Sequence, residues 1–309
     1  MSAADSPYFS VIIPLYNREN LIQNTIQSVL NQDTEKSFEV VVIDDGSKDA
    51  SAAKVKEMGD SRIRYIYQKN AGANVARNHG VDVAKGQYVA FLDSDDVFME
   101  DHLSTSATVL SDNPHTVVYA KIVVDRGEGN TFLKPPRGIK KGEHMSDYLF
   151  RHKGFLQTST LVLPKELAKK VRFDNELPFG QDMDFAVRLF AEGASFYMKE
   201  KPSVVWRDVF DANRISSKSR PDIREKWVQG VRHLLTNKAY LAYRGWFVAK
   251  AYAQEGNYGK AIIRYLPALV SNCYGVKQSL IVGFQIFFPQ TLYRKLADKY
   301  ISKKSKSIK

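Results

Sequence analysis

Short apolar runs alternate with helix-like segments through the first half of the chain. The runs continue without polar interruption, as in strands that are covered on both faces. Strands separated by helical segments are typical of a mostly parallel α/β sheet flanked by helices, of the Rossmann-like kind. The predicted strands are residues 9–15, 38–44, 63–67 and 87–93, and the predicted helices between them are residues 19–30, 49–58 and 74–84.

The pattern changes in the second half of the chain. Residues 117–124 and 158–163 predict further strands, residues 182–192 predict a helix, and the Gly-, Pro- and Lys-rich residues 126–142 predict a loop. From about residue 221 the pattern is helical, with helices expected at 234–253 and 258–269. We therefore expect an α/β domain over residues 1–217 and a mainly α-helical region over residues 218–309.

Charge is distributed unevenly along the 309 residues, whose net charge is +11. Residues 1–217 hold 27 Lys and Arg against 30 Asp and Glu, whereas residues 218–309 hold 18 against 4. A basic segment attracts nucleic acid or anionic lipid, although a solvated helical surface is the plain alternative. The basic region also contains apolar stretches and several aromatic residues: Trp227, Trp246, Phe247, Phe284, Phe287 and Phe288.

Two readings of the basic region stay open. It attaches the protein to an anionic membrane surface, with the lysine-rich end of the chain meeting headgroups, or it packs as a helical bundle on the α/β domain or on a second copy of the chain. The apolar residues 279–292 are too few, and too interrupted by Pro289, to predict a membrane span. The single cysteine, Cys273, and the absence of a secretory signal predict a cytoplasmic protein, peripheral at the inner face of the membrane.

Aspartates gather where two of the predicted strands end. Asp44, Asp45 and Asp49 follow the second strand, and Asp93, Asp95 and Asp96 follow the fourth. Ligands of open parallel sheets bind beyond the carboxyl ends of the strands, so the two groups are expected to meet at one cleft. Converging carboxylates repel one another unless a cation or hydrogen-bond donors stabilise them, and oxygen ligands suit Mg²⁺ or Mn²⁺. No zinc spacing, GxxxxGK[ST] loop or GxGxxG after the first strand is present.

Each aspartate group also has a plain structural reading. Asp95 or Asp96 would cap a helix that begins near Glu100. The segment IDDGSKD would form a turn with Gly46 at positive φ, with Ser47 or Asp49 capping the following helix.

Four ordered motifs carry a resemblance to a known family. The segments FSVIIPLYN, VVVIDDGSKD, QKNAGANVARNHG and GQYVAFLDSDD resemble family 2 of the inverting glycosyltransferases, which has the GT-A fold. The resemblance is dense over residues 9–96 and thinner as far as residue 217. It implies that residues 8–100 bind a nucleotide-sugar and that residues 101–217 form the acceptor side of the catalytic domain.

The resemblance also implies roles for individual residues. Pro14, Tyr16 and Asp44 match positions that bind the nucleotide base, most often uracil. Arg77 matches a residue that supports the base or diphosphate; Asp93 matches one facing the ribose and sugar, and Asp95 the metal ligand. The remaining positions assigned to the donor are Asn17, Glu19, Asp45, Gly46, Asn70, Gly72, Ser94 and Arg207.

The segment PFGQDMDFAVRLFAEG resembles the family element that carries the general base. Its position is occupied by Asp182, preceded by Gln181 where Glu is usual, and Asp184 ranks second. A charge stabilised by a helix dipole is the plain alternative for Asp182. Trp206 and Arg207, with residues 214–217, resemble a loop that closes over the donor, where Arg207 would contact the diphosphate.

Together these features predict an inverting, Mn²⁺- or Mg²⁺-dependent glycosyltransferase. It would move a sugar from a UDP-sugar, or another nucleotide-diphosphate sugar, to a hydroxyl of a glycan or lipid-linked acceptor, as in bacterial surface-polysaccharide assembly. Gln157, Thr158 and Ser159 would line the acceptor side or simply begin a strand. A non-catalytic sugar- or nucleotide-binding protein and a nucleotidyltransferase are the alternatives, and nucleic acid is disfavoured because the expected cleft is acidic.

Overall fold

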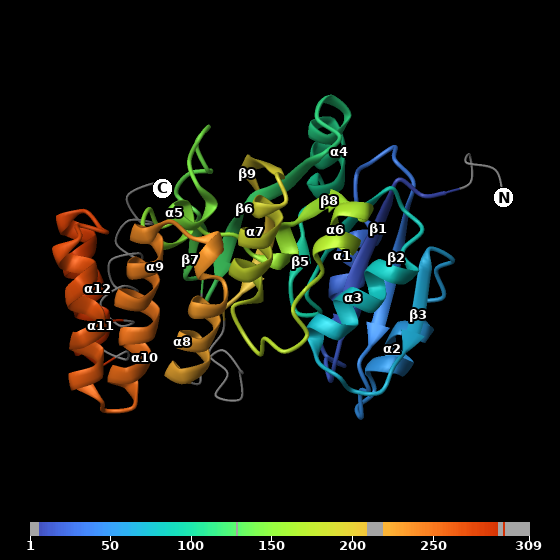
Figure 1. Ribbon diagram of the computed structural model, residues 1–309. Coiled ribbons are helices and arrows are strands. Elements are labelled where there is room, and N and C mark those ends of the chain that lie inside the picture. Colours follow the sequence, from blue (N-terminus) through green and yellow to red (C-terminus); the bar gives the residue numbers. More distant parts are fainter. Residues whose placement is uncertain (1–5, 128, 209–218, 290–292, 294–309) are drawn as a thin grey trace. The chain divides into compact units, whose positions relative to one another are not determined.

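The computed structural model describes residues 6–127, 129–208, 219–289 and 293 (Figure 1). The chain forms two compact units. The first comprises Met1–Asp125, Leu133–Gly138 and Leu156–Val209, and the second comprises Arg126–Phe132, Ile139–Phe155 and Phe210–Lys309. Residues 126–132 and 139–155 therefore group with the C-terminal helices, although the sequence placed them before the predicted boundary at residue 217.

Four parallel strands form the first half of the sheet in the first unit. β1 (Phe9–Leu15) pairs with β2 (Phe38–Asp44) on one side and with β4 (Tyr88–Phe91) on the other, and β2 pairs with β3 (Ile63–Tyr67). All seven residues of β1 are buried, as expected for a central strand. The bounds predicted for the first three strands are confirmed.

The rest of the sheet is mixed. The strand order is β3-β2-β1-β4-β8-β6-β9-β5, with β7 paired to β6. β8 is antiparallel to both β4 and β6, β9 is parallel to β6, and β5 is antiparallel to β9. The bounds of these strands are Val97–Phe98 for β5, Thr116–Asp125 for β6, Thr131–Lys134 for β7, Val162–Pro164 for β8 and Ser195–Arg207 for β9.

Two sequence predictions in this region were wrong. The loop expected at 126–142 contains strand β7, whose alternate residues are exposed and which therefore lacks the apolar run of the central strands. The strand expected at 158–163 begins with a 3-10 turn, Thr158–Thr160, before β8. Thr160 donates its hydroxyl to the Gln157 carbonyl at 2.7 Å, a local bond that competes with strand pairing.

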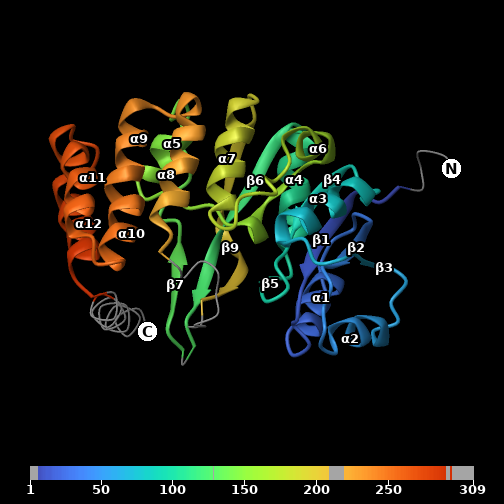
Figure 2. The same cartoon turned by 60° about the horizontal axis from the view of Figure 1, so that its bottom comes forward.

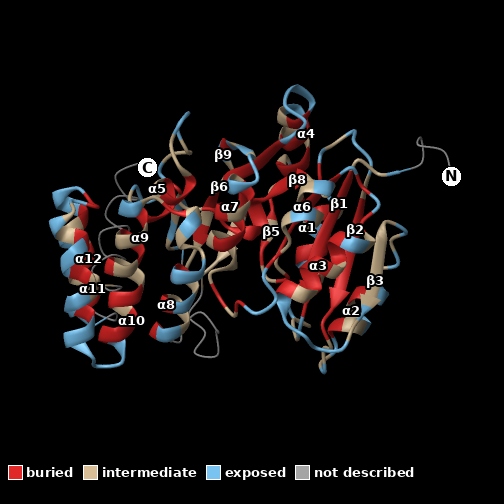
Figure 3. Ribbon diagram, viewed as in Figure 1, coloured by how far each residue is buried: buried red, intermediate tan, exposed pale blue. Residues whose placement is uncertain are grey.

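Helices cover the sheet of the first unit, and Figure 3 shows the central strands β1, β2 and β4 as buried, with the edge strand β3 only partly so. α3 lies close to β1, because a Cβ atom on Gly80 would come within 2.3 Å of the Ile12 side chain. The helices of this unit are α1 (Ile22–Leu30), α2 (Ser51–Glu57), α3 (Ala73–Val83), α4 (His102–Asp112), α6 (Lys165–Val171) and α7 (Gln181–Ala191). The α/β fold class and a mainly helical C-terminal region are confirmed.

The second unit is built from helices, which Figure 2 shows stacked side by side from α8 to α12. Its members are α5 (Met145–Phe150), α8 (Pro221–Gly230), α9 (Asn237–Tyr243), α10 (Ala249–Gln254), α11 (Tyr258–Val270) and α12 (Val276–Phe287), and a π-helical segment, Arg244–Val248, joins α9 to α10. Gly245 lets α11 approach this segment, since a Cβ atom there would lie 2.4 Å from Ala268 Cβ.

Aromatic rings fill the centre of this second unit. Phe150 contacts Tyr243 at 5.1 Å between ring centroids, and Tyr243 stacks on Phe247 at 4.9 Å. Trp227 lies 4.8 Å from Tyr243. Trp227 and Phe247 are half-buried in this cluster, and their contact with a membrane stays a prediction. Among the described residues, no helix combines the length and the hydropathy that a membrane crossing requires.

Candidate active site

The carboxyl ends of β1, β2 and β4 lie at one edge of the sheet, because these strands are parallel. The loop after β1 contacts the segments that follow β2 and β4. Asn17 donates its backbone N–H to Ser47 Oγ at 3.1 Å and accepts from the Lys48 N–H at 2.8 Å, both beyond β2. Arg18 Nε lies 3.5 Å from Asp95 Oδ2, beyond β4. The two aspartate groups that are distant in sequence therefore share one edge.

Asp44 and Asp45 are buried and engaged at the end of β2. Asp44 accepts from the Ser47 N–H at 2.8 Å and from the Tyr65 hydroxyl at 2.6 Å. Asp45 accepts at 2.8 Å from three donors, which are Gln68 Nε2 and the backbone N–H groups of residues 71 and 72. Asp45 thus holds the segment that leads into α3.

Gly46 and Asn70 belong to the same junction. Asn70 Nδ2 donates to the Asp45 carbonyl at 2.8 Å. Gly46 has φ +79, and a Cβ atom there would lie 2.9 Å from the Asn70 backbone nitrogen. The structure therefore gives Asp45, Gly46, Asn70 and Gly72 a joint role in fixing two loops, and their contact with a donor stays a prediction. Asp49 accepts from the Ser51 N–H at 3.0 Å. The cap residue of α2 is nevertheless Ala50, which makes no side-chain cap bond, so the expectation that Ser47 or Asp49 caps this helix was wrong.

Arg77 is a buried cation beside the second aspartate group. Its guanidinium donates to Asp93 Oδ1 at 2.5 Å and to Asn74 Oδ1 at 3.1 Å, and it lies over the Phe173 ring, 5.3 Å from the centroid. Arg77 Nε has no hydrogen-bond partner among the described residues. The Asp93 side chain keeps 28% of its surface exposed. Arg77 thus contacts Asp93 directly, and its support of the base or diphosphate stays a prediction.

Asp96 is the buried member of the LDSDD group. Its carboxylate accepts from Gln157 Nε2 at 2.7 Å, Ser159 Oγ at 2.6 Å and the Arg207 N–H at 3.2 Å. Burial, followed by the charges of Asp93 and Asp95, raises the pKa of Asp96 well above its ordinary value. The helix-cap reading for Asp95 and Asp96 was wrong, because α4 begins at His102 and has no side-chain cap.

Asp182 lies in the first turn of α7. Its Oδ1 accepts from the Thr158 N–H at 3.1 Å and also from the Thr158 hydroxyl. Burial is the main cause that raises the pKa of Asp182 to about 6, and Asp93 raises it further, while Thr158 and Arg77 oppose the shift. Asp184 is buried and paired to Arg188 four residues on, with Arg188 Nε 2.9 Å from Oδ2. Asp182 is thus the carboxylate of α7 that lies close to Asp93 of the LDSDD segment.

The segment Gln157–Ser159 connects the two carboxylate sets. Ser159 Oγ accepts the Asp93 N–H at 3.0 Å and donates to Asp96, while Thr158 holds Asp182. All three side chains are at most 5% exposed. The expectation that they begin a strand was wrong, because Thr158–Thr160 form a 3-10 turn, and a place on the acceptor side stays a prediction. A polar QTST run between apolar runs was the signal in the sequence, because buried polar groups need partners.

The other predicted residues lie around this edge. Pro14 is buried in β1, two residues beyond Ile12, which is the last residue of β1 that pairs with β4. Tyr16 is 43% exposed. Glu19 accepts from the Ala50 N–H at 2.8 Å, and Ser94 accepts through its carbonyl from Thr25. Trp206 and Arg207 end strand β9 and do not form a loop, and residues 214–217 lie outside the described residues.

Metal binding has a limited set of ligands in the chain. Among the described residues, no three His, Cys, Asp or Glu side chains form a ready metal site. Mg²⁺ is commonly held by one or two carboxylates, with substrate phosphates and waters as the other ligands. The partly exposed oxygens of Asp93 and Asp95 suit such an ion when a diphosphate accompanies it.

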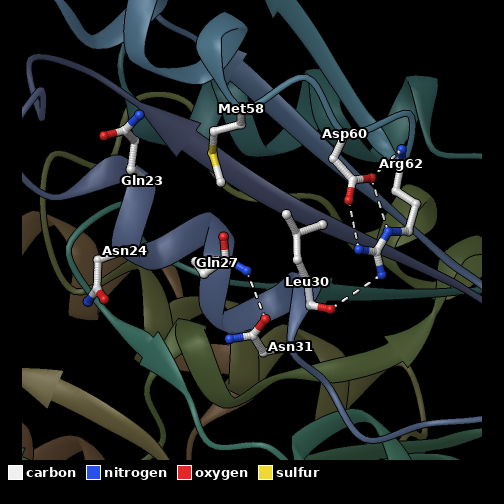
Figure 4. A pocket seen from close by; sticks show the side chains of 8 residues that line it. All are labelled: Gln23, Asn24, Gln27, Leu30, Asn31, Met58, Asp60 and Arg62. Carbon is white, nitrogen blue, oxygen red and sulfur yellow. Dashed lines mark hydrogen bonds and ion pairs between the residues drawn. The ribbon is translucent and has the colours of Figure 1, made fainter.

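A hollow elsewhere in the first unit is separate from these carboxylates. It has a volume of about 510 Å³ and lies along α1 and at the amino ends of β2 and β3 (Figure 4). Arg62 is fixed there by Asp60 at 2.7 Å and by the Leu30 carbonyl at 3.3 Å. The hollow's lining contains none of the residues predicted for donor, metal or base: Gln23, Asn24, Gln27, Leu30, Asn31, Met58, Asp60 and Arg62.

Comparison with known protein families identifies the family. The pattern described as "Glycosyl transferase family 2" matches residues 10–172, more than half of the chain, and includes the aspartate groups and the Gln157–Ser159 segment. The chain belongs to this family. It is therefore a glycosyltransferase, and both the family resemblance and the enzyme class predicted from the sequence are confirmed.

The relatives of this family 2 glycosyltransferase are bacterial. It is 30% identical over 266 residues to "Amylovoran biosynthesis glycosyltransferase AmsB" of Erwinia amylovora, covering 80% of this chain and 85% of that protein. It is 31% identical to "Minor teichoic acid biosynthesis protein GgaA" of Bacillus subtilis, covering 67% of this chain and 51% of that one. It is 32% identical to "GalNAc(5)-diNAcBac-PP-undecaprenol beta-1,3-glucosyltransferase" of Campylobacter jejuni, covering 62% of each.

Solved structures support the fold. S. aureus TarS 1–349 in complex with UDP-GlcNAc superposes with a TM-score of 0.61 at 18% identity, covering 90% of this chain and 86% of that one. The mannosyltransferase PcManGT from Pyrobaculum calidifontis, in complex with GDP-Man and Mn²⁺, superposes with a TM-score of 0.57 at 17% identity, covering 91% and 85%. At these identities the similarity establishes the GT-A architecture alone.

Proposed function

We propose that this glycosyltransferase transfers a hexose or N-acetylhexosamine from a nucleotide-diphosphate sugar to an acceptor hydroxyl, with inversion. The observation that carries the proposal is the placement of Asp182. Its carboxylate, with a pKa of about 6, interacts with Asp93 and Arg77 at the carboxyl edge of the sheet. A base must be ionised near neutral pH and must lie beside the reacting sugar. A pKa of about 6 and a position close to Asp93, which the family resemblance assigns to the sugar, support this role for Asp182.

The proposed reaction is a single displacement at the anomeric carbon. Asp182 takes the proton of the acceptor hydroxyl while the acceptor oxygen bonds to that carbon, and the bond to the diphosphate breaks on the opposite face. Arg77 and Asp93 hold the ribose and sugar side, and Tyr16 offers an exposed ring to the base. A divalent ion held by Asp95 would neutralise charge on the departing diphosphate.

The donor and metal follow from the family neighbours. One solved neighbour holds UDP-GlcNAc, and another holds GDP-Man and Mn²⁺. We therefore place the donor in the class of nucleotide-diphosphate sugars, with UDP first because Asp44 and Tyr16 occupy the positions that the family uses for uracil. Mn²⁺ or Mg²⁺ is the proposed cofactor.

The acceptor is proposed from the relatives' names. One relative acts on an undecaprenol diphosphate-linked glycan, and others are named for amylovoran and minor teichoic acid biosynthesis. A lipid-linked glycan of bacterial surface-polysaccharide assembly fits this group. The enzyme would then work at the cytoplasmic face of the membrane, where a peripheral attachment keeps it near its acceptor.

Nucleotide release tests the proposal. The purified protein is incubated with a panel of nucleotide sugars and Mn²⁺, with and without chelator, and free UDP or GDP is measured. We expect release with one donor or a few, abolished by chelator. Binding of the sugar nucleotide without release under any condition would favour the alternative of a non-catalytic sugar-binding protein.

Two variants sharpen the test. Asp182→Asn is expected to bind the donor as the wild type does and to lose turnover, because Asn is similar in shape and cannot take a proton. Asp184→Asn is the matched control on the same helix. Turnover by Asp182→Asn that equals the wild type would remove the base assignment.

A further inference from the structure

Helices α11 and α12 each expose large apolar side chains. On α11, Ile263, Leu266 and Val270 recur at intervals of three and four residues and therefore lie on one side of the helix. They are 61%, 50% and 86% exposed. On α12, Val276 and Leu280 are 81% and 71% exposed. We call these five residues the α11–α12 face.

The two helices form one surface because they pack against each other. The Tyr265 hydroxyl donates to the Ser279 carbonyl at 2.6 Å, and its ring lies 5.9 Å from that of Phe287. A Cβ atom on Gly283 would come within 3.0 Å of the same hydroxyl. In Figures 1 and 2, α11 and α12 lie side by side as the last described helices of their unit. The buried sides of both helices thus face their neighbours, while apolar residues remain on the outer side.

Exposed apolar side chains grouped in this way call for a partner, since monomers rarely expose large contiguous apolar patches. The charge of the segment indicates which partner. Residues 256–297 contain no Asp or Glu, whereas Lys260 and Lys277 are exposed on α11 and α12. Arg264 does not contribute, because it is paired to Glu225 at 3.1 Å. Apolar side chains beside exposed lysines, on helices without carboxylates, complement a layer of acyl chains under anionic headgroups.

A second copy of the chain is less suitable as the partner. Pairing two α11–α12 faces would bring lysines together with no carboxylate on either helix to oppose them. Like charges held close to an apolar interface are unfavourable. An anionic bilayer supplies the missing negative charge.

We propose that the α11–α12 face docks on an anionic lipid surface. The inference deepens the proposed function by naming the attachment face and the lipid class, and it does not depend on the sugar or the metal. Docking would concentrate the enzyme on the surface that carries a lipid-linked acceptor. It assigns the attachment to exposed aliphatic side chains of α11 and α12, and not to Trp227 and Phe247, which are half-buried against Tyr243.

Vesicle flotation of the full-length chain tests the proposal. Vesicles of phosphatidylglycerol and phosphatidylcholine are compared with vesicles of phosphatidylcholine alone. The test variant is Val270→Glu with Leu280→Glu, which places two charges at positions already in contact with solvent. The matched control, Lys226→Gln with Lys238→Gln, makes the same change of net charge at exposed positions of α8 and α9.

We expect the wild type to float with the anionic vesicles only. The test variant is expected to lose at least about tenfold in partitioning, since two aliphatic side chains no longer leave water, and the control less than about threefold. Equal flotation of the test variant and the wild type, or no flotation of the wild type, would overturn the proposal. A dimer in light scattering that the test variant abolishes would also overturn it, by making the face a contact between copies.

Donor turnover keeps the two proposals separate. UDP or GDP release without vesicles is expected to be the same in the wild type, the test variant and the control, because none of the changed residues belongs to the active site. Failure of flotation with normal release would remove the membrane face and leave the enzyme assignment standing. Flotation without release of UDP or GDP would leave the membrane face standing and count against the proposed transfer reaction.

Discussion

Thr158→Val isolates one hydrogen bond at the proposed base. The Thr158 hydroxyl donates to Asp182 Oδ1. This hydrogen bond lowers the pKa of Asp182 while burial raises it, and the resulting pKa is about 6. A hydrogen bond to a charged group contributes about 1.5–3 kcal/mol, which corresponds to one or two pKa units at about 1.4 kcal/mol each. Removing the hydroxyl should therefore raise the pKa of Asp182 to roughly 7–8.

The assay is kcat/KM for sugar transfer between pH 5 and 9. A base must be ionised, so activity rises with pH through its pKa. The wild-type profile should rise near pH 6, and the Thr158→Val profile about one to two units higher. At pH 6 the variant should be roughly 5- to 50-fold slower, and at pH 9 nearly equal.

Controls separate this effect from a loss of structure. Thr158→Ser keeps the hydroxyl and should keep the wild-type profile, and donor affinity should be the same in all three proteins. A folded Thr158→Val protein whose profile still rises near pH 6 would refute the reasoning, as would a Thr158→Ser protein that behaves like Thr158→Val.

Three further predictions concern the metal, a turn and a buried lysine. Asp95→Ala should lose Mn²⁺-dependent UDP binding in calorimetry and keep its melting temperature, whereas retained Mn²⁺ dependence would move the metal to other ligands. Gly46→Ala should lower stability by about 1–3 kcal/mol in urea unfolding, because it combines positive φ with a clash against the Asn70 backbone; an unchanged midpoint would contradict this. Lys199 is buried and donates to the His102 carbonyl at 2.8 Å, and burial lowers its pKa to about 7. The unfolded chain keeps that proton to about pH 10, so stability should rise from pH 7 to 10, and Lys199→Met should lack this rise.

The first strands were predictable because each is a single apolar run with helix signals on both sides. β1, β2 and β3 agree with the sequence at every boundary. β9 and β7 were not predicted, because their polar and apolar residues alternate irregularly and their place depends on pairing with β6. Burial of a run can be inferred locally, whereas pairing with a distant strand cannot.

The same difference applies to the active site. Asp93, Asp95 and Asp182 were found through motifs that lie at strand or helix ends. The role of Gln157–Ser159 was missed, because only the folded chain brings these side chains to carboxylates more than 20 residues away. Asp45 was expected to contact the donor, and its three protein donors became visible only in three dimensions.

The turn Thr158–Thr160, with Gln157 before it, bears on how this enzyme acquires a new sugar preference. One short segment holds both Asp93, proposed for the donor side, and Asp182, the proposed base, so a change there would disturb two parts of the proposed reaction at once. Mutational libraries for altered donors should therefore leave residues 157–159 untouched and vary exposed side chains outside this segment, such as Tyr16, which would contact the nucleotide base.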